Sequence, residues 1–148
     1  MELYFLRHGE SQANVARFFA SVEGNWPLSD DGRLQAQRQA AKMKSRDLDT
    51  IYCSTLVRTR ETAGIVGEAC GKSPIATDKL VEIGLGDLDG KNQDDPVNKN
   101  TFDDVLARWT NREMDARFPE GESLREASGR VGDFLHELPA DARRILVV

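Results

Sequence analysis

Arg7 and His8 follow directly on the apolar run of residues 3–6, and their side chains are of types that handle phosphoryl groups. The apolar run predicts a short buried strand, so both residues are expected in the loop at its carboxyl end, where ligands bind in open α/β sheets. The planar guanidinium of arginine stays charged and binds phosphate through paired hydrogen bonds. A histidine that is neutral near pH 7 can attack phosphorus as a nucleophile.

Gly9 and Ser11 suit a sharp turn that leads into a helix. Glycine lets the backbone turn or approach a ligand closely, and serine is a favoured helix N-cap. The free N–H groups of a helix N-terminus favour an anion. The segment therefore predicts an anion site, and the alternative interpretation is a chance tetrapeptide in an ordinary strand-to-helix turn.

Arg58 is a candidate for a second cation at the same site. Residues 49–53 are β-branched and aromatic and predict a second strand, which a helix follows to about residue 69, where Gly71 can close it. Arg58 lies one turn into that helix, so it would lie beside His8 if the two strands are neighbours. The alternative for Arg58 and Arg60 is a solvated helix face, and that interpretation fits Arg60.

The remaining elements predict an α/β fold, because strands alternate with helices as in parallel βαβ units. We expect one three-layer α/β/α sandwich with a mostly parallel sheet. Ser29 is a good N-cap, and Ser123 with Glu126 forms a capping box. The expected strands are 2–7, 49–53, 74–77 and 143–148; the other expected helices are 11–19, 29–46, 101–116 and 123–138; and the expected loops are 21–28 and 91–100.

Three separated motifs resemble those of the histidine phosphatase superfamily, the phosphoglycerate-mutase-like proteins. The matching residues are Arg7-His8-Gly9-Glu10-Ser11 with Asn14, then Ser54, Leu56, Arg58, Thr62 and Ala63, and then Glu82-Ile83, Gly86 and Asp89-Gly90. The motifs follow the family's order and, with weaker matches at 27–36 and 121–123, extend from residue 3 to the last residue. The resemblance implies a phosphoglycerate-mutase-like fold.

The resemblance also implies a role for each site residue. His8 is the nucleophile, Arg7 and Arg58 clamp the phosphate, Asn14 is a neutral phosphate ligand, and Glu82 is the general acid. A phosphate close to Glu82 would favour its protonated, proton-donating form. Apart from the motif, Glu82 would be an ordinary loop carboxylate and Asn14 an ordinary helix residue.

Four other features are interpreted as structural. Residues 27–36 predict a capped helix that covers the sheet, and capping explains Ser123 without substrate contact. The stripe of Phe102, Val105, Leu106 and Trp109 predicts a packing face. His136 matches no motif and is expected on the surface.

One departure from the family concerns the C-terminal end. The family places a second histidine, within Ser/Thr-His-Gly, directly after the strand that residues 145–148 resemble, and this sequence contains no such histidine. We therefore expect residues 1–148 to form a single histidine-phosphatase-like domain that lacks C-terminal elements and belongs to a longer polypeptide. Without that histidine, weak turnover or none is expected.

The function that the resemblance implies is transfer of a phosphoryl group through a phosphohistidine, with neither a metal nor another cofactor. Hydrolysis of small phosphomonoesters is expected, since the modest 91–122 region offers little to shield a phosphohistidine from water. A phosphoglycerate mutase is the first alternative. A phosphate-binding module without catalysis, or an inactive fragment, is the second.

The composition limits the partners. Of 148 residues, 30% are charged and 39% are apolar, which is ordinary for a globular protein, and the net charge of -5 argues against general nucleic-acid binding. The sequence has no apolar stretch long enough to cross a membrane. Cys53 and Cys70 suggest neither a disulfide framework nor a metal site, so a cytoplasmic location is expected. The expected partner is a small phosphorylated metabolite, and a homodimer is left open.

Overall fold

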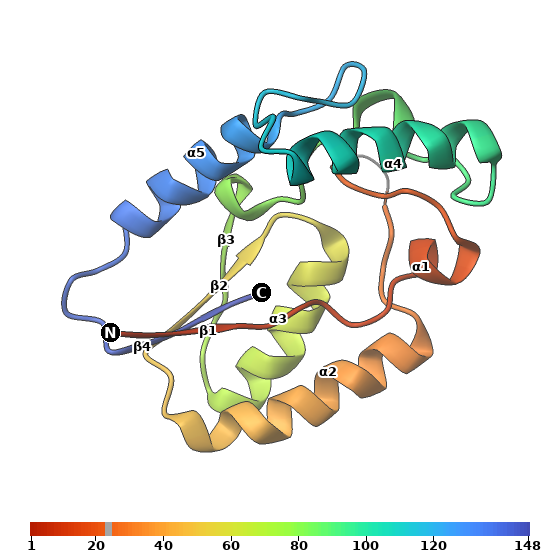
Figure 1. The fold of residues 1–148 in the computed structure, drawn as a ribbon. Helices are drawn as coiled ribbons and strands as arrows, with labels where there is room; N and C mark the ends of the chain where they lie inside the picture. Colours follow the sequence, from red (N-terminus) through yellow and green to blue (C-terminus); the bar gives the residue numbers. More distant parts are fainter. Residues whose placement is uncertain (23–24) are drawn as a thin grey trace.

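A parallel sheet forms the centre of the computed structural model, which describes residues 1–22 and 25–148 (Figure 1). Among the described residues the sheet has four strands, and every neighbouring pair is parallel. In sheet order the strands are β1 (Glu2–Phe5), β4 (Arg144–Val147), β2 (Thr50–Ser54) and β3 (Ile75–Thr77). The predicted α/β fold with a parallel sheet is confirmed.

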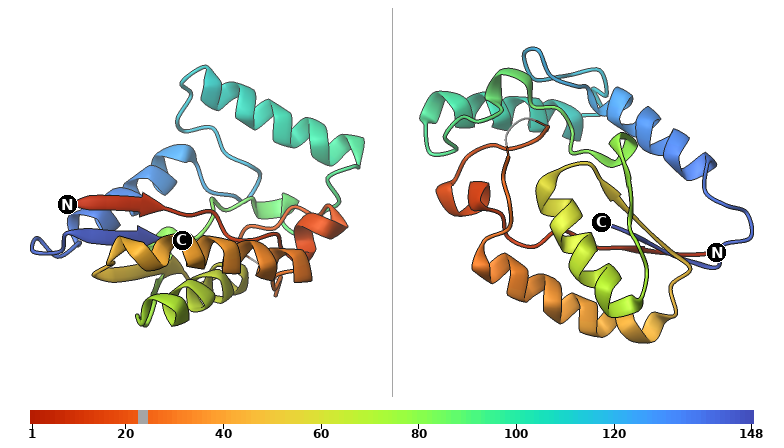
Figure 2. Two further views of the ribbon diagram at one scale, coloured as in Figure 1. Left: turned by 90° about the horizontal axis from the view of Figure 1, so that it is seen from below. Right: turned by 180° about the vertical axis from the view of Figure 1, so that it is seen from behind.

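Helices cover both faces of this sheet (Figure 2). α2 (Asp30–Met43) and α3 (Val57–Cys70) lie on one face, and α5 (Leu124–His136) lies on the other. Neighbouring residues of β4 point to opposite faces. Leu146 therefore packs with Val66 of α3, whereas Ile145 and Val147 pack with Phe134 of α5. Burial on both faces explains why this strand is entirely aliphatic beyond Arg144.

A second apolar cluster lies apart from the sheet and contains α4 (Pro96–Thr110), which Figure 1 shows well away from the strands. Its members are mainly aromatic and leucine residues, namely Phe19, Leu85, Leu88, Phe102, Val105, Trp109 and Phe118. Two short 3₁₀ helices, η2 (Asp78–Leu80) and η3 (Gly86–Leu88), lie along the segment that joins β3 to this cluster.

The predicted bounds of α4 are wrong. The sequence prediction placed a loop at 91–100 and a helix at 101–116, but the helix runs from Pro96 to Thr110. Asp95 accepts hydrogen bonds from the N–H groups of Val97 and Asn98, so it is the N-cap. Proline is well suited to the first helical position, where a missing N–H costs nothing, so Pro96 begins the helix that it was expected to exclude.

The first strand and the first helix are both shorter than predicted. β1 ends at Phe5, and α1 (Gln12–Ala16) ends where Arg17 takes a left-handed conformation with φ of 57°. β1 pairs with β4 on one side and forms an edge of the described sheet. The expectation of a buried strand is therefore wrong at Phe5, whose exposure is 71%.

The other elements agree closely with prediction. α2 continues into a short 3₁₀ helix (Lys44–Arg46) and so covers the predicted 29–46 helix, while α5 ends at His136, two residues early. The loop predicted at 21–28 includes residues 23–24, which lie outside the described residues. Cys53 is buried, Cys70 is partly exposed, and both thiols are free. Within the described residues, no helix is long and apolar enough to cross a membrane.

Candidate active site

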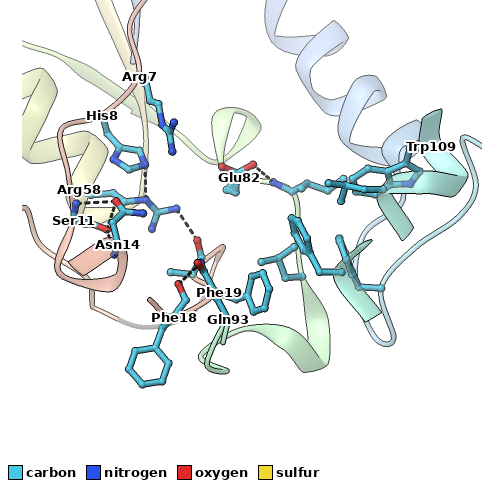
Figure 3. Close-up of a pocket in the computed structure, with 16 residues that line it drawn as sticks. Arg7, His8, Ser11, Asn14, Phe18, Phe19, Arg58, Glu82, Gln93 and Trp109 are labelled. Atoms are coloured by element: carbon cyan, nitrogen blue, oxygen red, sulfur yellow. Dashed lines mark hydrogen bonds between the residues drawn. The ribbon is translucent and has the colours of Figure 1, made fainter. Parts of the chain in front are cut away.

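All five predicted site residues line one cavity of about 360 Å³ (Figure 3). Arg7 and His8 lie in the loop after β1, Asn14 lies in α1, Arg58 lies in the first turn of α3, and Glu82 lies between η2 and η3. The carboxyl ends of β1 and β2 point toward the same edge of the parallel sheet, which brings these distant segments together.

The hydrogen bonds of His8 define its tautomer. Nδ1 lies 2.7 Å from the carbonyl oxygen of Gly9, which can only accept, so Nδ1 carries the proton. Nε2 is therefore unprotonated, and its lone pair accepts a hydrogen bond from Nε of Arg58 at 3.2 Å. The imidazole is thus neutral, with its unprotonated nitrogen beside a guanidinium.

The surroundings of His8 also favour this neutral form. Burial lowers the pKa of His8, and the charges of Arg58 and Arg7 lower it further. The hydrogen bond to Gly9 and the charge of Glu82 oppose this shift without reversing it. A nucleophilic histidine needs an unprotonated nitrogen, so the shift has the direction that catalysis requires.

Arg58 is a buried arginine held in a fixed orientation. Its side chain is 4% exposed, and Nη2 donates to the carbonyl oxygens of Ala20 at 3.1 Å and Ser21 at 3.3 Å. Burial lowers the pKa of Arg58, and the nearby carboxylates of Glu82 and Asp89 oppose that change. Among the described residues none accepts a hydrogen bond from Nη1, which leaves a donor for an anion.

Asp89 holds the loop that carries these two carbonyl groups. Its carboxylate accepts hydrogen bonds from the N–H of Ser21 at 2.8 Å, from the Ser21 hydroxyl at 2.6 Å and from the N–H of Val22 at 3.0 Å. The acidic residue of the predicted Asp89-Gly90 pair therefore acts on the site through Ser21 and Arg58.

Arg7 and Asn14 are also able to bind an anion. Arg7 is exposed, lies on the His8 side of the cavity in Figure 3, and forms no ion pair with a described carboxylate. Oδ1 of Asn14 accepts from both the N–H and the hydroxyl of Ser11 at 2.9 Å, which completes a capping box at the start of α1. This bonding uses the amide oxygen and leaves the amide NH₂ as a donor.

Glu82 is exposed and lies between the cationic side and the aromatic side of the cavity in the view of Figure 3. Its Oε1 accepts a hydrogen bond from the N–H of Ile83 at 3.1 Å. The carboxyl group can therefore approach a leaving group in the cavity, as a general acid must.

An ion pair from α5 holds the segment that carries Glu82. Arg130 donates to the carbonyl oxygens of Lys79 and Val81, each at 2.9 Å. It also pairs with Glu122 through hydrogen bonds of 3.0 and 2.7 Å, and Glu122 accepts from the N–H of Gly84 at 3.2 Å. Sequence reasoning missed Arg130, since no local pattern links residue 130 to residues 79–84.

The turn around His8 is held by the start of α2. A Cβ at Gly9 would lie 2.3 Å from the carbonyl oxygen of Gly32, so the two backbones touch. Glu10 accepts from the N–H of Ser29 and donates to Oε1 of Gln35, each at 2.9 Å. Residues of the 27–36 motif, read from sequence as covering the sheet, therefore also position the site.

Thr62 joins the same turn to α3. Its hydroxyl accepts from the N–H of Gly9 at 3.1 Å and donates to the carbonyl of Arg58 at 2.7 Å. One side chain thus connects the backbone beside His8 to the backbone of Arg58.

The aromatic stripe on α4 has a second role that sequence reasoning missed. Val105 is buried, as expected of a packing face, but Phe102, Leu106 and Trp109 also line the cavity. Their helical spacing predicted a buried face, but it could not indicate that this face also borders the cavity. His136, by contrast, lies exposed on α5 as predicted and is not part of the cavity lining.

The described residues hold no group of three or more histidine, cysteine, aspartate or glutamate side chains arranged to bind a metal ion. The site offers an anion two guanidinium groups and an amide beside a neutral imidazole. The arrangement suits transfer of a phosphoryl group, in which the protein supplies position and positive charge.

Known proteins share both the sequence pattern and the fold. The family model for the histidine phosphatase superfamily (branch 1) matches residues 3–148. A probable phosphoglycerate mutase GpmB from Escherichia coli O1:K1 is 35% identical over 150 residues, which cover 99% of this chain and 68% of the relative.

Two solved structures are similar over nearly the whole chain. A putative alpha-ribazole-5'-P phosphatase from Escherichia coli has a TM-score of 0.81 at 28% identity, with 99% of this chain and 71% of that one covered. A phosphoglycerate mutase from Thermus thermophilus has a TM-score of 0.73 at 30% identity, with coverage of 99% and 76%. The chain belongs to the histidine phosphatase superfamily, whose members are phosphatases or phosphoglycerate mutase-like enzymes that act on small phosphorylated substrates.

Proposed function

We propose that this chain hydrolyses small phosphomonoesters, with weak turnover, through a phosphohistidine at His8. The observation that carries the proposal is the hydrogen bonding of the imidazole, which places the proton on Nδ1 and leaves the Nε2 lone pair beside Arg58 in the cavity. The cytoplasmic location of the reaction belongs to the same proposal, in keeping with the free thiols of Cys53 and Cys70.

In the first step Nε2 of His8 attacks phosphorus, and the bond from phosphorus to the ester oxygen breaks. Arg7, Arg58 and the amide of Asn14 hold the peripheral phosphate oxygens, where the negative charge lies. The protonated carboxyl of Glu82 gives its proton to the departing oxygen, because an alkoxide is a poor leaving group. The products of this step are an alcohol and N-phosphohistidine.

In the second step water attacks phosphorus and the bond between phosphorus and Nε2 breaks. The Glu82 carboxylate, now without its proton, takes one from the water, which restores the starting state of the enzyme. Inorganic phosphate leaves with the oxygen of that water.

A phosphoglycerate mutase is the second candidate, and the printed name of the 35% identical relative favours it. The two reactions share the first step and differ in the acceptor. A mutase returns the phosphoryl group to a hydroxyl of the substrate carbon chain, whereas a phosphatase passes it to water.

The test is a short incubation with a labelled phosphomonoester, followed by a quench that avoids acid and by peptide mapping. We expect N-linked phosphate at His8 and label that accumulates as inorganic phosphate. Phosphate on a serine, or turnover that survives His8→Ala, would refute the mechanism. Label that stays in phosphoglycerate isomers would indicate a mutase, and binding without transfer would indicate a phosphate-binding module.

A further inference from the structure

The two walls of the cavity differ in chemistry, as Figure 3 shows. The cationic groups of the lining, Arg7 and Arg58, lie with His8 on one side. The facing wall carries apolar and aromatic side chains. Its partly or fully exposed members are Ile83, Phe102, Leu106 and Trp109, and the buried Leu85 and Phe118 pack in one cluster with Phe102 and Trp109. We infer that the substrate is a phosphomonoester whose alcohol part is an apolar ring system without a carboxylate. This inference rests on the proposed hydrolysis and names its substrate class.

The apolar wall is rigidly supported from behind. The Phe102 ring lies 4.9 Å from the Phe19 ring and 5.6 Å from the Phe118 ring, and the Trp109 ring meets Phe118 edge-on at 5.5 Å. Phe118 and Phe19 are buried. A preformed aromatic surface accepts a flat apolar group with little loss of conformational freedom.

The indole N–H of this wall is already engaged within the protein. Nε1 of Trp109 donates to the carbonyl of Ala116 at 2.7 Å, so the indole presents only its carbon surface to a ligand. At the edge of the wall, Nε2 of Gln93 donates to the carbonyl of Phe18 at 3.0 Å. A polar alcohol group would therefore lose its hydration here and gain few hydrogen bonds in return.

Charge works in the same direction. A carboxylate on the alcohol part would lie against apolar side chains and near the carboxyl group of Glu82, and no lining arginine lies on that wall. Burial of an unpaired charge is strongly unfavourable. The wall therefore disfavours phosphoglycerate and favours an aromatic or similarly apolar ring.

Binding of three phosphonates tests this inference without relying on turnover, because their phosphorus–carbon bond is not hydrolysed. The probes are phenylpropylphosphonate, propylphosphonate and carboxypropylphosphonate, measured by calorimetry on this chain. We expect the phenyl compound to bind roughly tenfold or more tightly than the propyl compound, as burial of a ring provides. The carboxypropyl compound should bind most weakly. Equal binding of the phenyl and propyl compounds, or tightest binding of the carboxylate, would overturn the inference.

Leu106→Lys should reverse part of this order, since Leu106 lines the wall and is 37% exposed. We expect weaker binding of the phenyl compound and stronger binding of the carboxylate. Ala107→Lys is the matched control, because it adds the same charge one residue along α4 at an exposed position outside the lining. The control should keep the wild-type order, and an equal change in both variants would contradict a role for the wall.

Hydrolysis of phenylpropyl and propyl phosphate separates this inference from the proposed function. The two alcohols are similarly poor leaving groups, so a higher kcat/KM for the phenylpropyl ester measures the contribution of the ring to recognition. If neither ester forms phosphohistidine, the proposed hydrolysis fails, and the phosphonate order still decides whether the wall selects apolar rings.

Discussion

In the proposed mechanism, His8 and Arg58 together supply the two main requirements of phosphoryl transfer, a nucleophile and a positive charge. Arg58 donates to Nε2, so it holds the imidazole in the tautomer that attack requires, and its charge also disfavours protonation of the ring. The carbonyl groups of Ala20 and Ser21 fix the guanidinium in turn. When Nε2 attacks phosphorus, Arg58 must release this hydrogen bond, and its guanidinium is then already positioned beside the developing charge.

The first prediction concerns the pKa of His8. Arg58→Ala removes a cation and part of the burial, and both changes favour the imidazolium, so the pKa of His8 should rise. In an NMR titration the midpoint of the His8 ring signal should move to higher pH. The His8→Asn variant assigns that signal, because the signal is missing from its spectrum. The acid limb of kcat/KM should shift in the same direction, since only neutral His8 attacks. Arg60→Ala, an exposed arginine two residues along the same helix, should leave the titration unchanged. A lower pKa in Arg58→Ala would contradict this account.

The second prediction assigns Glu82 as the acid. Glu82→Gln should lower kcat on the order of 10²-fold for an alkyl phosphate, because the alkoxide then leaves without a proton. An activated aryl phosphate needs no such help and should lose little. Asp87→Asn, an exposed carboxylate in the same segment, is the control and should affect neither substrate. Equal losses on both substrates would remove Glu82 from this role.

At the scale of elements, close backbone contact fixes the turn that carries the nucleophile. A Cβ at Gly32 would lie 2.0 Å from the carbonyl oxygen of Glu10, so the first turn of α2 packs directly on this turn. Ser29 caps the same helix and bonds to Glu10, which joins the start of α2 to the loop after β1. The loop that carries His8 is therefore held against the start of α2.

The third prediction follows from this contact. Gly32→Ala should lower the free energy of unfolding by about 1–3 kcal/mol, as overpacking does, and should displace the turn and reduce activity. Gly64→Ala is the matched control, because it lies in α3 with no atom near its added Cβ, and it should be neutral or stabilising by about 0.5–1 kcal/mol. Urea unfolding of both variants measures the difference. Similar stability of the two would show that the backbones separate easily.

The fourth prediction treats Arg130 as a positioning residue for Glu82. Arg130→Ala breaks its bonds to Lys79 and Val81, so the segment that carries Glu82 should lose its fixed geometry. As for Glu82→Gln, we expect kcat to fall more for alkyl phosphates than for aryl phosphates. KM should change less than kcat. Arg125→Ala, which removes an exposed ion pair with Asp115 from the same helix, is the control. An equal fall on both substrates would indicate a merely structural role.

The sequence allows the main elements and the proposed site to be predicted, and the exceptions have physical causes. The apolar run before Arg7 and the capping pair of Ser123 with Glu126 are local signals, and they identified β1 and the start of α5. Pro96 is ambiguous because proline both breaks helices and begins them. The pairing of Arg130 with Glu122 depends on the folded arrangement, and no spacing in the sequence encodes it.

At the scale of the whole molecule, the site lies between two apolar clusters. The sheet with α2, α3 and α5 supplies Arg7, His8 and Arg58, while the aromatic cluster around α4 supplies the facing wall. Arg130 and Asp89 connect the two sides through hydrogen bonds to the segments between them. A ligand that fills the cavity therefore touches both halves and should favour their association.

The last prediction concerns the stabilisation of the folded chain by a bound ligand, measured first with inorganic phosphate. A ligand that binds only the folded state at a hundred times its Kd stabilises that state by about 2.7 kcal/mol. For a chain of this length the gain corresponds to a rise in Tm of roughly 5–10 °C. Thermal unfolding in phosphate should show this rise relative to chloride at the same ionic strength. Arg58→Ala should lose much of it because the buried donor is gone, whereas Arg60→Ala should keep it. Phenylpropylphosphonate reaches both walls of the cavity, so with that ligand hydrogen exchange should slow in α4 as well as around His8. Slowing confined to the sheet side would mean that the aromatic wall does not respond to the phosphate site.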